Sequence, residues 1–278
     1  MKRHALIIGI NHYTDPTIQS LRFAEQDATE VYGWLKHRMA FDEATLLAGS
    51  QAEEEAIIAA LHALSGDLGP EDLFVLYFAG HGVEDRNEHW LLTGCAQVAR
   101  LKWHKAMVSV GEIREASVGR GCGRLLVLDA CRNALRRGLR LAEAPGQSTR
   151  SLRDLLGRPT GDVEEGPLGI LCACDEKQTA LELEERRQGV FTAALLEEFA
   201  ACGRGGFAFG ADVCVRLEER MRRLCGGAHR QRPWFQCTGV LPPLFEEGGG
   251  APFVSAVIPR PPPAETQWHV HIDGRREI

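Results

Sequence analysis

Short apolar runs separated by helical patterns are the feature that most constrains the fold of this chain. Ala5–Ile10, Asp72–Gly82 and Gly123–Asn133 contain such runs, bounded by turn-forming residues, as expected for buried strands. Ala24–Met39 has apolar residues at helical spacing, and Gln51–Leu64 has an acidic first turn, so both segments are predicted as helices. This alternation predicts an α/β fold, with a mainly parallel β-sheet flanked by helices on both faces.

Two of the predicted strands end in residues that can take part in catalysis. One ends in Asp129 and Cys131, and the other stops at His81, which lies between two glycines. In an open α/β sheet, ligands bind beyond the carboxyl ends of the strands. Because strand side chains alternate, Asp129 and Cys131 face the same side if the strand extends that far. A thiolate nucleophile near an imidazole that exchanges a proton at neutral pH fits peptide hydrolysis.

Taken singly, each of these residues also has an ordinary structural interpretation. A cysteine at a strand end is usually a small inert apolar group, and a single histidine usually has a packing role. The joint occurrence of His81 and Cys131 at two strand ends favours the catalytic interpretation. No third residue that would orient the histidine is evident in the sequence.

The two motifs around these residues resemble a known family. Phe-Ala-Gly-His-Gly (78–82) and Asp-Ala-Cys-Arg (129–132), with His81 50 positions before Cys131, are similar to the caspase-like C14 cysteine peptidases. The aspartate before Ala-Cys is closer to metacaspases and bacterial caspase homologues than to animal caspases. The resemblance implies a caspase-like αβα sandwich, a His81–Cys131 dyad, and an oxyanion hole formed by the backbone N–H groups of Gly82 and Cys131.

The resemblance also implies a pocket for the substrate residue before the cleaved bond. Leu21–Ala28 matches a metacaspase motif that places Asp27 beside Asp129 in this pocket, with Ala79 and Ala24 where the family often has serine or cysteine. Two converging carboxylates repel unless a cation joins them, so we expect cleavage after Arg and, second, after Lys. The alternative is that Asp27 only stabilises the start of a helix.

Further features of the family map onto the second half of the chain. Cys174 and Asp175 match a substrate-groove loop, and the Arg-rich segment 135–166 lies where caspase-like proteases are processed into two subunits. We therefore expect a peptidase domain over residues 1–243 with a mobile, self-cleaved loop. A Gly/Pro-rich linker (244–266) and the start of an incomplete appended segment (267–278) are predicted to follow. The predicted self-cleavage sites are Arg137, Arg140, Arg150, Arg153 and Arg158.

Composition excludes several other functions. A net charge of −6 argues against nucleic acid as a partner, and no apolar run is long enough to span a membrane. Nine cysteines without paired metal-ligand spacing indicate reduced thiols in the cytoplasm, with no zinc site and no cofactor. Ala96–Leu101 and Arg132–Leu141 contain no acidic residue, which argues against the calcium dependence of many metacaspases. Activation would then come from a partner or an appended domain.

The sequence therefore predicts a cysteine endopeptidase that acts on protein or peptide substrates. A role in defence or regulated cell death follows from family analogy alone. The alternative is a catalytically silent caspase-like scaffold, which the intact His81 and Cys131 disfavour. A doubly wound nucleotide-binding domain is a weaker alternative, because no glycine-rich phosphate-binding motif follows any predicted strand.

Overall fold

The computed structural model describes residues 1–85, 88–96, 107–117, 120–131, 165–174, 178, 180–202, 207–210, 212–227 and 231–245, with Glu84, Asp85 and Cys131 described by their backbone alone. Its strands are β1 (Arg3–Gly9), β2 (Glu43–Ala48), β3 (Leu73–Asp85), β4 (Glu88–Leu92), β5 (Met107–Ser109), β6 (Gly123–Cys131), β7 (Leu168–Cys172), β8 (Glu182–Leu183), β9 (Gln188–Gly189) and β10 (Trp234–Cys237). Its helices are α1 (Ala24–Gly33), continued by a π-helical turn over Trp34–Arg38, then α2 (Glu54–Ser65), α3 (Val110–Ala116), α5 (Val190–Cys202) and α6 (Val213–Leu224).

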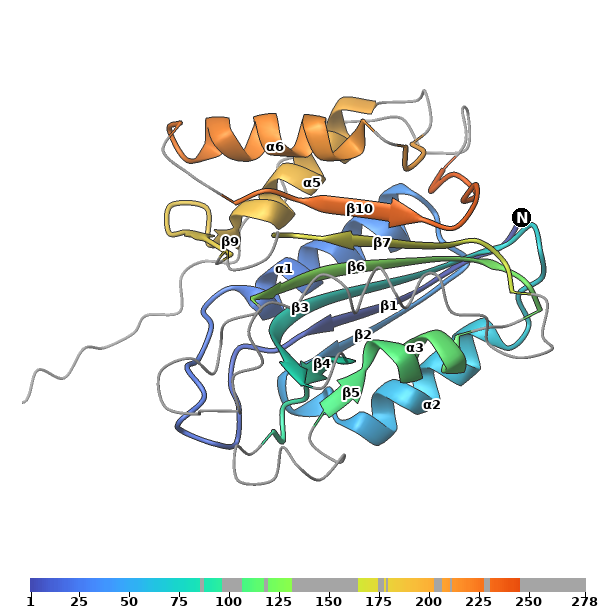
Figure 1. Ribbon diagram of the computed structural model, residues 1–278, viewed down its shortest axis with the longest axis horizontal. Helices are drawn as coiled ribbons and strands as arrows, with labels where there is room; N and C mark the ends of the chain where they lie inside the picture. Colours follow the sequence, from blue (N-terminus) through green and yellow to red (C-terminus); the bar gives the residue numbers. More distant parts are fainter. Residues whose placement is uncertain are drawn as a thin grey trace, which may run out of the picture.

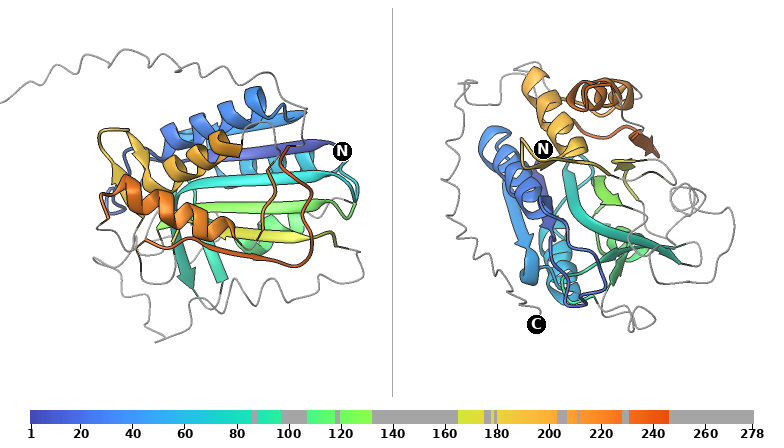
Figure 2. Two further views of the ribbon diagram at one scale, coloured as in Figure 1. Left: turned by 90° about the horizontal axis from the view of Figure 1, so that it is seen from above. Right: turned by 90° about the vertical axis from the view of Figure 1, so that its left-hand side faces the viewer.

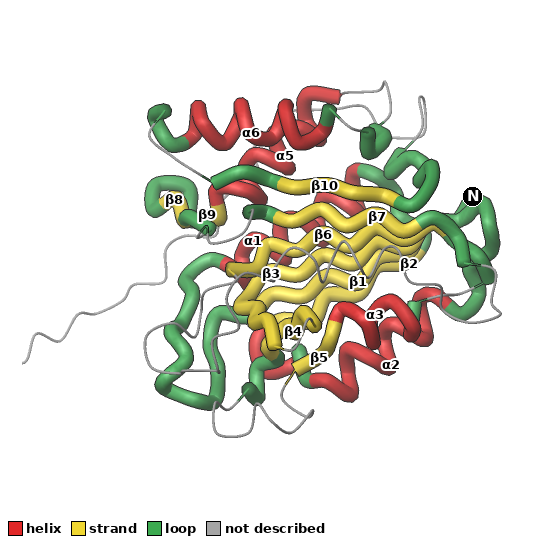
Figure 3. Tube along the Cα trace, in the orientation of Figure 1, coloured by secondary structure: helices red, strands yellow, loops and turns green. Residues whose placement is uncertain are grey.

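The central sheet has the strand order β10-β7-β6-β3-β1-β2 (Figures 1 and 3). β2, β1, β3, β6 and β7 pair in parallel, and β10 pairs with β7 in the antiparallel direction. A small hairpin, β8–β9, lies outside this sheet. The predicted mainly parallel α/β fold is therefore confirmed.

Helices cover both faces of the sheet (Figure 2). The strands supply apolar side chains to each face in alternation. In β1, Ala5 and Ile7 belong to the core shared with α1, α5 and α6. Leu6 and Ile8 belong to the core shared with α2 and α3. Since both faces are buried, the strands are continuous apolar runs, which made them recognisable in the sequence.

β3 continues past His81, which corrects the prediction that this strand stops there. Up to His81 it pairs with β6, and from Gly82 to Asp85 it pairs with β4. The polar stretch Glu84–His89 thus includes the ends of two paired strands. Glycine is required at Gly80, where an added Cβ would lie 2.8 Å from the Phe78 ring.

Three predicted boundaries also change. α2 begins at Glu54, three residues later than predicted, because Gly49–Gln51 forms a separate 3-10 turn. The domain includes Leu244 and Phe245, predicted as linker, since both are buried in the α1/α5/α6 core. Glu165 belongs to the predicted mobile loop, yet it forms ion pairs with two buried arginines. The rest of that loop, 135–164, and the predicted segments from residue 246 onward lie outside the described residues.

None of the described helices is long and apolar enough to cross a membrane.

Candidate active site

His81 and Cys131 are paired in the backbone register of two neighbouring parallel strands. They form the last pair of the β3–β6 register, and β3 leaves β6 for β4 at the next residue, Gly82. The backbone of β6 extends to Cys131, so the strand holds as far as the sequence predicted. The pair thus lies where the central sheet ends, the position at which α/β proteins bind ligands.

The segment after β1 fixes the imidazole of His81. Its Nε2 lies 2.6 Å from the carbonyl oxygen of Gln19, which can only accept, so Nε2 donates and holds the proton of the neutral ring. Tyr13 stacks on the ring with 5.2 Å between the centroids, and its hydroxyl accepts a 2.8 Å hydrogen bond from the His81 backbone N–H. Nδ1 is buried and has no hydrogen-bond partner among the described side chains. The ring therefore keeps a free lone pair at Nδ1.

Burial lowers the pKa of His81 below its ordinary value, while the hydrogen bond to Gln19 and the charge of Glu182 oppose this shift. The imidazole is consequently neutral near pH 7 and able to accept a proton. Sequence reasoning missed Gln19 and Tyr13 as orienting residues. Gln19 binds through its backbone carbonyl, which any residue type can supply, so its role has no sequence signature.

Asp27 of α1 and Asp129 of β6 are brought together at the same end of the sheet. They are only 2% and 8% exposed. A Cβ added to Gly189 would lie 2.8 Å from Asp27 Oδ2 and 3.2 Å from Asp129 Oδ2. Both carboxyl groups therefore border the same small space beside Gly189. The N–H of Gly189 donates to both oxygens of Asp27, at 3.1 and 2.9 Å. Two acids distant in the sequence thus share one buried location.

Burial raises the pKa of both carboxyl groups. It raises the pKa of Asp129 to about 6, against a hydrogen bond from Thr192 that lowers it. The pKa of Asp27 is raised well above its ordinary value, first by burial and then by the charge of Asp129, while the Gly189 N–H opposes both. The negative charge of Asp129 thus disfavours ionisation of Asp27, and a cation placed between the two carboxyl groups would favour the charged form of both.

Two further acids lie near this pair, and the sequence did not predict them. Glu30 and Glu182 both raise the pKa of Asp27. Gln188 Nε2 donates to Glu30 at 2.5 Å, and Arg22 Nε pairs with Glu182 at 3.0 Å, so these contacts hold the β8–β9 hairpin against α1 and the segment just before it. β8 and β9 have only two residues each, too few for a recognisable alternating pattern.

The other predicted site residues occupy more ordinary places. Ala79, opposite Asp129 in the register, and Ala24 are both buried in the α1/α5/α6 core. Cys174, expected in a substrate groove, is 1% exposed and its Sγ lies 3.8 Å from the Ala130 carbonyl oxygen, so its side chain packs inside the domain. Asp175 and the predicted cleavage sites Arg137, Arg140, Arg150, Arg153 and Arg158 lie outside the described residues.

No cluster of three or more histidine, cysteine, aspartate or glutamate side chains suited to a metal ion occurs in the part of the chain that the structure describes. The predicted absence of a metal and of a cofactor stays a prediction.

Comparison with known families decides the identity of this fold. The family model Peptidase_C14, described as the caspase domain, matches residues 2–245. The chain belongs to this family. The caspase domain thus contains His81, Cys131 and both buried aspartates, and the resemblance inferred from the two motifs is confirmed.

A solved structure shares the fold of this chain. The chain is similar to protein GSU0716 from Geobacter sulfurreducens, with a TM-score of 0.60 and 20% sequence identity, over 86% of this chain and 94% of that one. At this identity the likeness concerns the fold alone. No curated protein matches the sequence.

Proposed function

We propose that this caspase-domain protein is a cysteine endopeptidase that cleaves peptide bonds after Arg and, second, after Lys. The observation that carries the proposal is the pairing of His81 with Cys131 at the end of the central sheet, beside two buried aspartates. The family adds that this domain type is associated with peptidases.

The orientation of His81 defines the proton path. Because Nε2 is bound to the Gln19 carbonyl, Nδ1 is the atom that takes the thiol proton of Cys131. The thiolate then attacks the peptide carbonyl, and the Nδ1 proton passes to the departing amine, which leaves a thioester for water to hydrolyse. The Gln19 carbonyl stabilises the imidazolium that forms between these steps. Backbone N–H groups of Gly82 and Cys131 would hold the oxyanion, at about 3–4 kcal/mol each.

The preference for basic residues follows from the acid pair. Asp27 and Asp129 are buried close together with raised pKa values, an arrangement that a guanidinium would relieve by pairing with both carboxylates. Lysine has the same charge without the planar fork and should bind less tightly. An aspartate side chain would bring a further negative charge to this acidic pocket and should be rejected.

The experiment is a panel of fluorogenic peptides with Arg, Lys or Asp at the cleavage position. The wild type should cleave the Arg peptide fastest and the Asp peptide not at all, and Cys131→Ala should abolish cleavage. Cys225→Ala, which removes a half-buried thiol after α6, serves as the matched control and should stay active. Cleavage after Asp would contradict the specificity, and no turnover by the wild type would favour the scaffold alternative.

The same proposal covers processing and cofactors. Self-cleavage within 135–164 should appear in mass spectra of the purified wild type and be absent from Cys131→Ala. Cleavage should need no calcium, so a chelator should leave the rate unchanged. A role in defence or cell death is part of the proposal and rests on family analogy. The proposed cytoplasmic location rests on the cysteine usage, and the proposed activating partner rests on the absence of acidic residues from 96–101 and 132–141.

A further inference from the structure

A chain of two hydroxyl groups leads to the carboxylate of Asp129. Thr192 Oγ1 lies 2.8 Å from Asp129 Oδ2 and 2.6 Å from the hydroxyl oxygen of Tyr77. An ionised carboxylate can only accept, so Thr192 donates its one hydroxyl hydrogen to Asp129. Tyr77 must then donate to Thr192. The direction of both hydrogen bonds is therefore fixed when Asp129 is charged.

This chain joins three separate elements inside the domain. Tyr77 comes from β3, Thr192 from the first turn of α5, and Asp129 from β6. Tyr77 and Thr192 are 1% and 0% exposed, so water does not compete for either hydroxyl. A helical threonine often bonds to the carbonyl four residues earlier, whereas Thr192 directs its hydroxyl across to the sheet.

The two acids of the pair are stabilised in different ways. Asp27 accepts the backbone N–H of Gly189, which no side-chain substitution removes. Asp129 instead depends on the side chain of Thr192, its only hydrogen-bond donor among the described residues. The hydrogen bonding of Asp129, the acid beside the proposed nucleophile Cys131, thus depends on the side chain of Thr192.

Building on the proposed function, we propose that Thr192, oriented by Tyr77, is a positioning residue for recognition of the basic substrate side chain. It holds Asp129 charged and in one orientation, so that the incoming cation meets a fixed carboxylate. A donor to the charged form opposes the burial that would otherwise neutralise this acid.

Glu182 on β8 acts in the opposite direction, because its negative charge raises the pKa of Asp129. The other titratable groups on the neighbouring elements are Asp27 and Glu30 on α1, and Tyr77 and His81 on β3. Burial raises the pKa of Tyr77 well above its ordinary value, so its hydroxyl stays neutral and can donate to Thr192. Loss of the Thr192 hydroxyl should therefore move the ionisation of Asp129 to higher pH.

The test compares Thr192→Val, which keeps the shape and removes the donor, with Thr192→Ser, which keeps the donor. With an Arg peptide, Thr192→Val should raise KM about tenfold with kcat within about twofold, the scale of one hydrogen bond to a charged group. The acidic limb of the kcat/KM profile should shift upward by about one pH unit. Thr192→Ser should keep the KM and the acidic limb of the wild type. Tyr77→Phe should shift KM and the acidic limb in the same direction as Thr192→Val, by a smaller amount.

A second measurement does not depend on turnover. The carboxyl carbon resonance of Asp129 is titrated by NMR in Cys131→Ala with and without Thr192→Val, and its midpoint should rise when the hydroxyl is lost. An unchanged midpoint, or Thr192→Ser behaving like Thr192→Val, would overturn the positioning role. A wild type that cleaves no basic peptide would overturn the proposed function instead, and recognition with it, whatever the titration shows.

Discussion

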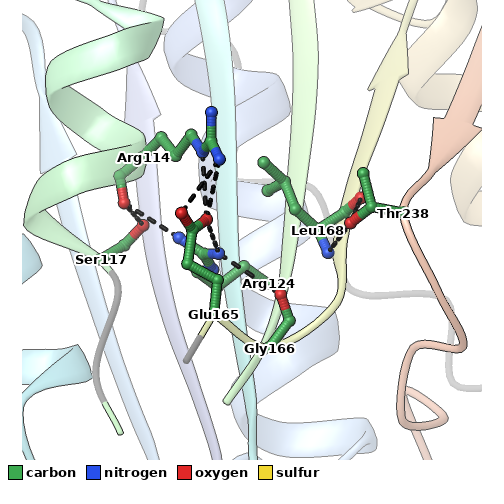
Figure 4. A network of polar contacts seen from close by, with 7 residues as sticks. All are labelled: Arg114, Ser117, Arg124, Glu165, Gly166, Leu168 and Thr238. Atoms are coloured by element: carbon green, nitrogen blue, oxygen red, sulfur yellow. Dashed lines mark hydrogen bonds and ion pairs between the residues drawn. The ribbon is translucent and has the colours of Figure 1, made fainter. Parts of the chain in front are cut away.

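Replacing Glu165 by glutamine should destabilise the domain strongly. Glu165 is the shared partner of two buried arginines, Arg114 of α3 and Arg124 of β6 (Figure 4). One oxygen, Oε2, lies 2.9 Å from Arg114 Nη2 and 3.0 Å from Arg124 Nη2. The arginine side chains are 6% and 0% exposed, and that of Glu165 is 15% exposed. The substitution keeps the shape and removes the negative charge that the two cations share.

The magnitude follows from the charges and their burial. Two unit charges about 4 Å apart interact by about 4 kcal/mol at an effective permittivity of about 20, and Glu165 makes two such contacts. The cost of burying the carboxylate offsets part of this. Arg124 also keeps its hydrogen bond to the Arg114 carbonyl oxygen at 3.0 Å. Removing one partner from a buried ion pair costs about 3–5 kcal/mol, which is the loss that we expect for Glu165→Gln.

Urea denaturation measures this loss, with Glu218→Gln as the matched control. Glu218 pairs with Arg232 at 3.3 Å, and the two side chains are 45% and 69% exposed, so this ion pair is solvated. The control should lose less than about 1 kcal/mol. With slopes of about 1–3 kcal/mol per molar urea, Glu165→Gln should unfold at least about 1 M earlier. A loss no larger than that of the control would refute the argument that burial makes Glu165 essential.

Three further substitutions test the candidate site. Gly189→Ala should lower both stability and activity, by about 1–3 kcal/mol in unfolding free energy, because its Cβ would come within 2.8 Å of a pocket carboxylate. Asp129→Asn should raise stability at pH 8 by about 1–3 kcal/mol and change it little at pH 4, since the folded carboxyl, with a pKa of about 6, resists ionisation that the unfolded one undergoes near its ordinary value. Tyr13→Phe should cost about 1–3 kcal/mol and lower kcat, because the backbone N–H of His81 loses its acceptor.

Each of these predictions has a control and a contrary result. Gly33→Ala, where an added Cβ meets nothing within 4 Å, should leave stability and activity close to wild type; equal losses in both glycine variants would contradict the packing argument. For Asp129→Asn, the wild type must lose stability relative to the variant as pH rises from about 4 to about 6. A constant difference across that range would show that the carboxyl does not titrate there. For Tyr13→Phe, unchanged kcat would show that the stacked ring alone orients His81.

Much of the chemistry could be predicted from local pattern. The catalytic candidates follow from apolar runs that end at His81 and Cys131, because a buried parallel strand leaves a continuous apolar segment in the sequence. The second acid, Asp27, was predicted from the resemblance of Leu21–Ala28 to a metacaspase motif, and the structure places it near Asp129. The local sequence pattern did not show which residues form hydrogen bonds with His81 and Asp129. Gln19 acts through its carbonyl and Thr192 through a contact across 63 residues, so neither stands out by residue type.

The sequence by itself determined the order of strands and helices, the family, and the residue types available at the strand ends, since these depend on periodicity and short motifs. Only the tertiary structure decided that β3 continues past His81, that Gly189 and Thr192 each bind one of the two acids, and that Glu165 pairs with two buried arginines. These contacts join distant segments, and their energies depend on burial and on distances of a few ångströms. Neither quantity exists until the chain is folded.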